Sequence, residues 1–340
     1  MKIIAKTLKF IGKFIVSILI LIILLGLGFR IFNSKPTPPG KLVDIDGTKI
    51  HVRVDGETNS LPTIIIEAGA HSNTEMLHWL NAGLKDKTKV IRYDRNGKWF
   101  SELNNNEEIS PEFYAQQLHK LLAKVGAKPP YILVGHSMGG PYTRIFRDLY
   151  PNEVEGIVFI DSSHPEQWKR LAQKKLLPDN QIRIIKIGSF LSDLGILGLY
   201  NKIFSKKAQD DTLPTESMER SRALTNYNGD IYRMFLRENI ATNEVLKRAE
   251  NSKKLDSLPV LVFTANEQYT ESQKQRYRKN GIDPEKQLKI WFDMQKELKN
   301  LSLNSKQIIM SANHNSIITE KTNADIINRE ILFMLKNGKK

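Results

Sequence analysis

The chain has 340 residues, 40% hydrophobic and 26% charged, which is enough for one large α/β domain or two small ones with a buried core. It contains no cysteine, which excludes disulfides, cysteine–zinc sites and a thiol nucleophile. The net charge is +14, and six of these positive charges lie in the first 40 residues, which hold no acid. Because the rest has no arginine-rich arm, we expect no nucleic-acid partner.

An apolar run near the N-terminus, Phe14–Phe29, follows four lysines. Together with Arg30–Phe32 it approaches the roughly 20 residues that a membrane-spanning helix needs. A cleaved signal peptide would begin in the same way, but the run ends without an Ala-x-Ala cleavage site. We therefore predict that residues 1–32 hold cytoplasmic lysines and a single-pass signal anchor in the cell membrane. The remaining chain then lies outside the cytoplasm.

The segment after the anchor, residues 33–40, contains three prolines and predicts a short, stiff linker. Strands and helices then alternate through residues 41–340, which predicts a mostly parallel, doubly wound sheet in one domain. The expected strands are a hairpin at Lys41–Glu57 around Asp46-Gly47, then Pro62–Gly69, Thr88–Gly97, Tyr131–Ser137, Glu155–Ser163, Leu258–Glu267 and Lys306–Asn315. The expected helices are Glu75–Lys85, Ser110–Val125, Met138–Tyr150 and Thr322–Leu335.

The alternation is interrupted over residues 164–256, a charged and amphipathic stretch with helical character. This interval is too long for a loop and predicts an inserted helical cap over the carboxyl edge of the sheet, where such folds bind ligands. Its most apolar part is Ile182–Phe204. That segment either packs as a helix pair on the sheet or forms a hydrophobic lid for an acyl or aromatic substrate, touching the bilayer.

Ser137 occupies the centre of Gly135-His-Ser-Met-Gly139, between an apolar strand and an amphipathic helix. A Gly-x-Ser-x-Gly turn in this context raises the serine hydroxyl above the sheet, and the glycines are small because strand and helix crowd together. We predict that Ser137 is a nucleophile and that the Met138 N–H binds the oxyanion. The second oxyanion donor is expected to be the Ala70 N–H, in the loop after the strand that begins at Pro62.

A serine nucleophile needs a base, and His314 follows the last predicted strand. The other histidines are less well placed, since they lie in the first hairpin, on helices, beside the serine or in loops. His71, next to Ala70, is either a substrate contact or an exposed loop residue. Asp94 and Arg95 are expected to form a buried structural ion pair or turn contact.

These motifs resemble the α/β-hydrolase superfamily from about Leu42 to Leu335, most closely bacterial esterase-like members. The resemblance implies hydrolysis of an ester or related acyl compound without a metal or organic cofactor. The loop where the superfamily most often carries its acid has no aspartate here. The acid is therefore either Asp161, at the end of the preceding strand, or Glu267.

We hypothesise a membrane-anchored serine hydrolase that acts on carboxylic esters, with a small ester or lipid-like molecule as substrate. The catalytic residues would be Ser137, His314 and Asp161, with Glu267 as the alternative acid. Other chemistry on the same scaffold (peptidase, thioesterase, lactonase or cofactor-free haloperoxidase) is one alternative. A non-catalytic binding protein of the cell envelope is another, and the sequence leaves the oligomeric state open.

Overall fold

One mixed sheet organises the fold, which is a computed structural model describing residues 2–33, 35–70, 72–104, 109–172, 177–204 and 212–337. Within these ranges the strand order is β1-β2-β4-β3-β5-β6-β7-β8. β1 to β2 and β2 to β4 pair antiparallel, and every other neighbouring pair is parallel. The strands are β1 (Lys41–Ile45), β2 (Thr48–Asp55), β3 (Thr63–Glu67), β4 (Val90–Tyr93), β5 (Tyr131–His136), β6 (Val154–Ile160), β7 (Val260–Ala265) and β8 (Ser305–Met310).

The first two strands form the predicted hairpin. Asp46 and Gly47 both have a positive φ, 53° and 84°, and they connect the paired residues Ile45 and Thr48. Two central residues with positive φ are typical of the tight turn whose twist matches that of the flanking strands. The hairpin that the sequence predicted around Asp46-Gly47 is therefore present, with Ile45 paired to Thr48.

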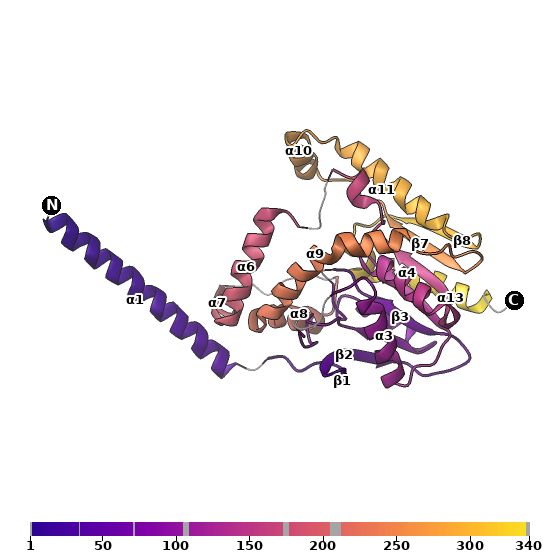
Figure 1. The fold of residues 1–340 in the computed structure, drawn as a ribbon, viewed down its shortest axis with the longest axis horizontal. Helices are drawn as coiled ribbons and strands as arrows, with labels where there is room; N and C mark the ends of the chain where they lie inside the picture. Colours follow the sequence, from indigo (N-terminus) through magenta and orange to yellow (C-terminus); the bar gives the residue numbers. More distant parts are fainter. Residues whose placement is uncertain are drawn as a thin grey trace.

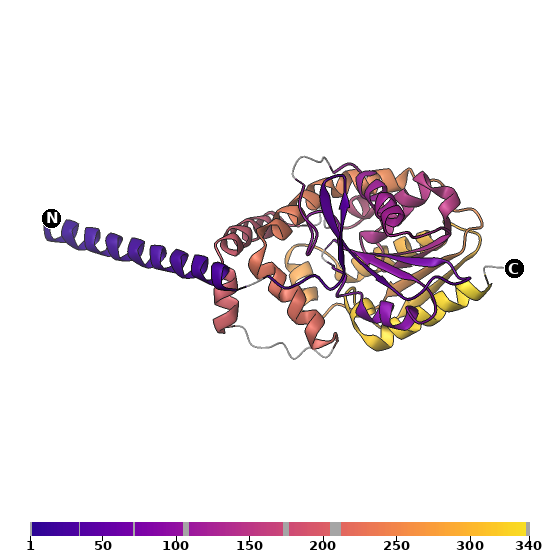
Figure 2. The same cartoon turned by 90° about the horizontal axis from the view of Figure 1, so that it is seen from below.

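Helices cover both faces of the sheet, as the two views show (Figures 1 and 2). On β3, Ile64 and Ile66 pack into one hydrophobic core and Ile65 into the other, because successive strand residues point to opposite faces. One core lies against α2 (His78–Leu84) and α13 (Lys321–Asn337), and the other against α3 (Phe113–Lys124) and α4 (Gly139–Leu149). The predicted doubly wound α/β fold is confirmed.

Some element ends differ from the sequence prediction. β4 stops at Tyr93 because Asp94 and Arg95 leave the sheet to make buried ion pairs. α3 begins at Phe113, after a turn that includes Pro111, and α2 begins at His78 because the residues before it form turns. A short helix, η1 (Pro151–Glu153), lies between α4 and β6, and another, α12 (Ser316–Thr319), lies between β8 and α13.

The interval between β6 and β7 is helical and covers one end of the sheet (Figure 1). Its longest helix, α9, packs on α4 and carries buried side chains along its length. The helices of this cap are α5 (Gln167–Arg170), α6 (Asp179–Asp193), α7 (Ile196–Phe204), α8 (Thr215–Tyr227) and α9 (Gly229–Glu250). Between β7 and β8 lie α10 (Glu271–Lys279) and α11 (Pro284–Lys299).

The N-terminal helix α1 (Lys2–Phe32) is 31 residues long and extends away from the rest of the molecule in both views (Figures 1 and 2). Residues Ile3–Phe32 are long and apolar enough to cross a membrane. A membrane anchor and a signal sequence both meet this criterion. The helix touches the body of the protein only near its C-terminal end, where Gly26 and Phe29 are buried within the described residues.

Candidate active site

Ser137 lies at the turn between β5 and α4, where the sequence predicted a nucleophile elbow. Its φ is 53°, in the left-handed region that residues other than glycine rarely adopt, so the surrounding structure holds this turn in place. A side-chain carbon at Gly135 would lie 2.7 Å from the backbone carbon of Gly139. Both positions require glycine because the strand and the helix meet at backbone distance.

Three side chains from different elements meet at this turn. The Nε2 atom of His314 is 3.0 Å from Ser137 Oγ, and its Nδ1 atom is 2.6 Å from Oδ2 of Asp161. The Asp161 side chain is only 4% exposed, whereas that of His314 is 45% exposed. When Nδ1–H donates to the carboxylate, Nε2 is available to accept the serine proton. The structure thus brings together the predicted nucleophile, base and first candidate acid.

Asp161, and not Glu267, contacts His314 in the described residues. Its second oxygen accepts hydrogen bonds from the Ala265 N–H and from Nε1 of Trp291 on α11, both at 3.1 Å. Three donors around one carboxylate hold it in one orientation. Glu267 lies exposed in the loop after β7. Sequence reasoning did not identify Trp291, because nothing in its helical context distinguishes it from an ordinary core residue.

The amides of Ala70 and Met138, predicted to bind the oxyanion, lie in the two loops next to Ser137. Gly69 packs so closely that a side-chain carbon there would be 3.0 Å from Ser137 Cβ. In the part of the chain that the structure describes, neither the Ala70 nor the Met138 N–H has a hydrogen-bond partner. Both can therefore donate to a bound oxygen atom. His71 lies outside the described residues.

Two buried cations hold the backbone of the loop that carries Ala70. The Arg95 guanidinium donates to the carbonyl oxygens of Ala68 at 2.6 Å and Gly69 at 2.9 Å. The Lys98 ammonium donates to the carbonyl oxygen of Ala70. Because these carbonyls are held on one side, the N–H groups of the loop keep a fixed direction. Such preorganisation is what an oxyanion site requires.

Two buried carboxylates, Glu67 and Glu238, pair with these cations. Arg95 contacts both, with Nε 2.9 Å from Glu238, while Lys98 pairs with Glu238. Burial lowers the pKa of Lys98 to about 8, although Glu238 opposes the shift. Burial alone would raise the pKa of Glu238, but Arg95 and Lys98 outweigh it, and the pKa lies below its usual range. The expected buried ion pair of Arg95 is confirmed, whereas Lys98 and Glu238 were not anticipated.

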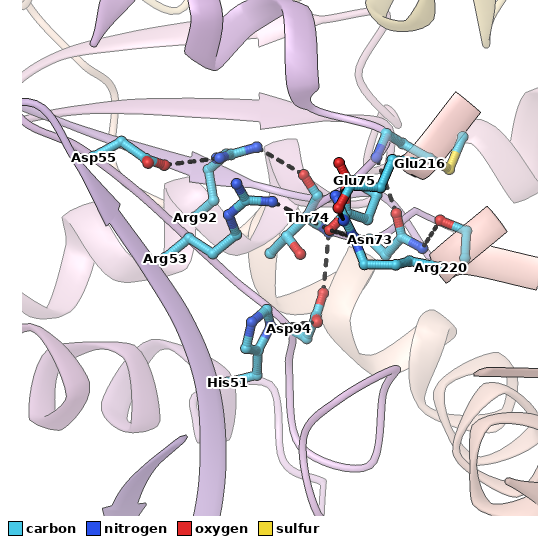
Figure 3. Close-up of polar contacts among 12 residues, drawn as sticks. His51, Arg53, Asp55, Asn73, Thr74, Glu75, Arg92, Asp94, Glu216 and Arg220 are labelled. Carbon is cyan, nitrogen blue, oxygen red and sulfur yellow. Dashed lines mark hydrogen bonds and ion pairs between the residues drawn. The ribbon is translucent and has the colours of Figure 1, made fainter. Parts of the chain in front are cut away.

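A second polar cluster holds the following residues of the same loop (Figure 3). The carboxylate of Glu75, nearly completely buried, pairs with Arg53 of β2 at 3.1 Å and with Arg220 of α8 at 2.9 Å. The Thr74 N–H donates to Asp94 at 3.1 Å. The loop is therefore attached to α8 through Glu75 and to α9 through the pair of Lys98 with Glu238. Both cap helices contribute ions to its support.

Two other histidines occupy structural positions. His51 in the first hairpin forms a buried pair with Asp94, with Nδ1 2.7 Å from the carboxylate. His136, next to Ser137, has its Nε2 atom 2.8 Å from the carbonyl oxygen of His314. Burial lowers the pKa of His136 to about 3, so the ring is neutral and its Nε2–H donates. His136 thus supports the backbone of His314, a role that its place in the motif did not reveal.

His164, at the start of the cap, is expected to make stability depend on pH. Burial lowers its pKa in the folded protein to about 4, compared with 6.5 for an exposed histidine. The unfolded chain binds the extra proton below pH 6.5, so the free energy of unfolding falls as the pH decreases from 6.5 towards 4. Between pH 7.5 and 5, this one group accounts for a loss of about 2 kcal/mol.

Urea unfolding of the full-length protein in detergent at pH 7.5 and pH 5.0 measures this loss. In His164→Gln the decrease between the two pH values should be about 2 kcal/mol smaller than in the unmodified protein. Equal decreases in both proteins would contradict the assignment.

His164 also belongs to a group of three side chains, with Glu166 and Glu297, whose ligand atoms lie within 4.8 Å of one another. The Arg170 guanidinium pairs with the carboxylate of Glu166 at 3.6 Å and with that of Glu297 at 2.7 Å. The Nδ1 atom of His164 accepts the Glu166 N–H at 3.1 Å. Since a cation already occupies the carboxylates, this group is an ion-pair cluster.

The fold and these contacts agree with what the chain resembles. A family model described as alpha/beta hydrolase fold matches residues 62–181, which include the Ser137 turn, Ala70 and Asp161. The enol-lactonase from Burkholderia xenovorans is similar in structure, with a TM-score of 0.54 at 16% identity, covering 87% of this chain and all of that one. An esterase from Exiguobacterium antarcticum is also similar in structure, with a TM-score of 0.56 at 13% identity, covering 88% of this chain and 100% of that one. The chain has the α/β-hydrolase fold, and residues 62–181 resemble that family in sequence.

Sequence relatives match shorter regions. An uncharacterized hydrolase of Bacillus subtilis, YraK, is 33% identical over 157 residues, which are 44% of this chain and 56% of YraK. The chain spans about two fifths of the length of the first curated relatives it matches. These similarities show that the chain shares the fold of known hydrolases.

Proposed function

We propose that this protein is a serine hydrolase that cleaves carboxylic esters through an acyl-enzyme intermediate. The contact chain from Ser137 to His314 to Asp161 is the observation that carries this proposal. The strained turn, the two available amides and the buried carboxylate are the further parts that an acyl transfer requires.

The reaction begins when Ser137 Oγ attacks the ester carbonyl carbon and His314 Nε2 takes the hydroxyl proton. The carbonyl oxygen becomes an oxyanion, which accepts hydrogen bonds from the amides of Ala70 and Met138. Asp161 stabilises the imidazolium that has formed. His314 then donates the proton to the leaving alcohol as the C–O bond breaks. Water, activated by His314, attacks the acyl group and regenerates Ser137.

We also propose that α1 is a retained signal anchor, so that the hydrolase domain lies outside the cytoplasm at the cell membrane. The length and composition of α1 support this location. The four lysines near the N-terminus favour a cytoplasmic position for that end.

A fluorophosphonate probe tests the proposed nucleophile, because it phosphonylates only an activated serine. The full-length protein in detergent is expected to gain one adduct by intact mass. Ser137→Ala should gain none. Ser163→Ala is the matched control, since this nearby serine lies at the end of β6 and its backbone N–H bonds to Ser137. A folded protein that gains no adduct would favour the non-catalytic binding protein instead. Equal labelling of Ser137→Ala would show that another residue is the reactive nucleophile and would overturn the assignment of Ser137.

A further inference from the structure

The outer cap helices, α6 and α7, expose rows of large apolar side chains. On α6, Ile184, Ile187 and Phe190 are 65%, 58% and 62% exposed, and they follow one face of the helix at a spacing of three residues. α7 exposes a second row, which consists of Tyr200, Ile203 and Phe204. Contiguous exposed apolar surface of this kind marks an interaction site.

The C-terminal end of α1 packs directly on these helices. A side-chain carbon at Gly26 would lie 2.6 Å from the carbonyl oxygen of Leu194, so the two backbones touch. Phe29 is buried beside Gly198 and stacks on Tyr227 of α8 with ring centroids 5.5 Å apart. Figures 1 and 2 both show this end of α1 beside α7.

This contact fixes the depth of the cap relative to a bilayer. An apolar helix crosses the hydrocarbon layer with about 20 residues at roughly 1.5 Å each. The apolar run of α1 ends at Phe29, and Arg30 follows it. Since the packed segment begins at Gly26, the outer cap helices lie at the level where α1 leaves the hydrocarbon. Exposed basic residues on them, Lys186 and Lys202, suit the phosphate groups found at that level.

A cavity of about 400 Å³ opens beside α6 and ends at the loop after β3 that carries Ala70, hereafter the oxyanion loop. Its inner end is lined by Ala70 and Lys98, and its walls by Leu177, Ile185, Ile231 and Phe235. Ile184 lines the cavity and also belongs to the exposed row on α6, so it lies at the mouth. The cavity thus extends from the exposed row on α6 to Ala70, one of the two predicted oxyanion donors.

We propose that α6 and α7 lie in the membrane–water interface, and that the substrates are membrane-resident esters whose hydrocarbon chain enters the cavity from the bilayer. This assignment rests on the proposed hydrolase function. The apolar cavity walls would replace the lipid surroundings of the substrate's hydrocarbon chain. The ester group would then reach Ser137 beside Ala70. A substrate drawn from the bilayer does not need to dissolve in water before it is bound.

The position of the cap can be measured independently of catalysis. Because the chain has no cysteine, Phe190→Cys and Leu303→Cys each give a single site for a fluorescent label. Phe190 is 62% exposed on α6, and Leu303, 95% exposed just before β8, is the control. In vesicles of anionic phospholipid, a lipid-borne quencher should quench the label at position 190 and not at 303. Equal quenching at both positions, or none at 190, would overturn the interfacial location.

The substrate class is tested with two esters on the same reconstituted protein. One is a water-soluble butyrate ester, and the other is a palmitoyl ester dissolved in the vesicles. The double variant Ile187→Ser, Phe190→Ser should hydrolyse the palmitoyl ester about tenfold more slowly, since two apolar contacts with the interface are lost. The double variant should hydrolyse the butyrate ester at an unchanged rate. The control variant Leu303→Ser should hydrolyse both esters at unchanged rates.

The outcomes separate the two proposals. If both esters are hydrolysed and the double variant changes neither rate, the substrate does not enter from the bilayer and the hydrolase proposal stands. If neither ester is hydrolysed and no fluorophosphonate adduct forms, the hydrolase proposal fails. The quenching experiment then still decides where the cap lies.

Discussion

Asp161→Asn is expected to lower kcat for ester hydrolysis by about 10³- to 10⁴-fold, with little change in KM. The amide oxygen of asparagine would keep the bonds from Ala265 and Trp291, so its NH₂ group would face His314 Nδ1. His314 would then accept at Nδ1 and carry its proton on Nε2. In that tautomer it cannot take the proton of Ser137, although the geometry of the site is preserved.

The measurement is steady-state hydrolysis of a soluble ester by full-length protein, with fluorophosphonate labelling rates as a second readout. Glu267→Gln is the matched control, because it makes the same chemical change at the other acid that the sequence proposed. It should leave kcat within about twofold, as expected for an exposed side chain away from the reacting atoms. A large effect of Glu267→Gln together with normal activity of Asp161→Asn would reverse the assignment of the acid.

Arg95→Met is expected to reduce the free energy of unfolding by about 3–5 kcal/mol, because removing one partner leaves buried charges uncompensated. Glu67 loses its only cationic partner among the described residues, and Glu238 keeps only Lys98. The carbonyls of Ala68 and Gly69 lose the guanidinium donor as well, although Gly69 keeps the Ser72 N–H. Hydrolysis should also slow, since the loop that presents the Ala70 N–H is no longer held.

Urea unfolding at pH 7.5 measures the loss, with Lys306→Met as the control for removing an exposed ion pair. Lys306 is 57% exposed and pairs with Glu330 at 2.7 Å, so its loss should change stability by no more than about 1 kcal/mol. Arg95→Lys retains the charge without the fork of donors and should be intermediate. If Arg95→Met and Lys306→Met were equally stable, the buried cluster would not hold the loop as described.

The prediction of Ser137 and His314, whose side chains the structure brings together, depends on local rules. The turn at Ser137 requires two glycines, an apolar strand before it and a helix after it, and all of these lie within twenty residues. His314 was found because it follows the last strand of an alternating pattern. In both cases the residues next to the reactive side chain determine its place in the fold. A single segment of the sequence is therefore enough to predict it.

The choice between Asp161 and Glu267 could not be made in this way. It depends on how the loops after β6 and β7 turn relative to the loop that carries His314. In the structure Asp161 adopts a positive φ of 39° and accepts the Ala265 N–H, which turns its carboxylate towards His314. The residues around Asp161 and Glu267 predict neither this backbone conformation nor the hydrogen bond from Ala265 to Asp161.

The buried ion pairs that hold the loop carrying Ala70 were still harder to predict from the sequence. Arg95 and Glu238 are 143 positions apart, and Glu75 and Arg220 are 145 apart. In the sequence Glu238 resembles any exposed acid on an amphipathic helix. Likewise, Gly195 and Gly198 lie where α1 and the cap approach each other, a contact that the residues around these glycines do not reveal.

The ion pairs between the oxyanion loop and the cap also bear on how this fold can be recombined. Along the chain the cap is an insertion, and insertions are often treated as modules that can be exchanged between homologous enzymes. Here Lys98 belongs to the sheet domain, yet its buried carboxylate partner, Glu238, belongs to the inserted segment. A chimera with a foreign cap would therefore leave the buried Lys98 without an anionic partner beneath the oxyanion loop, unless the new helix supplied an acid at the same place.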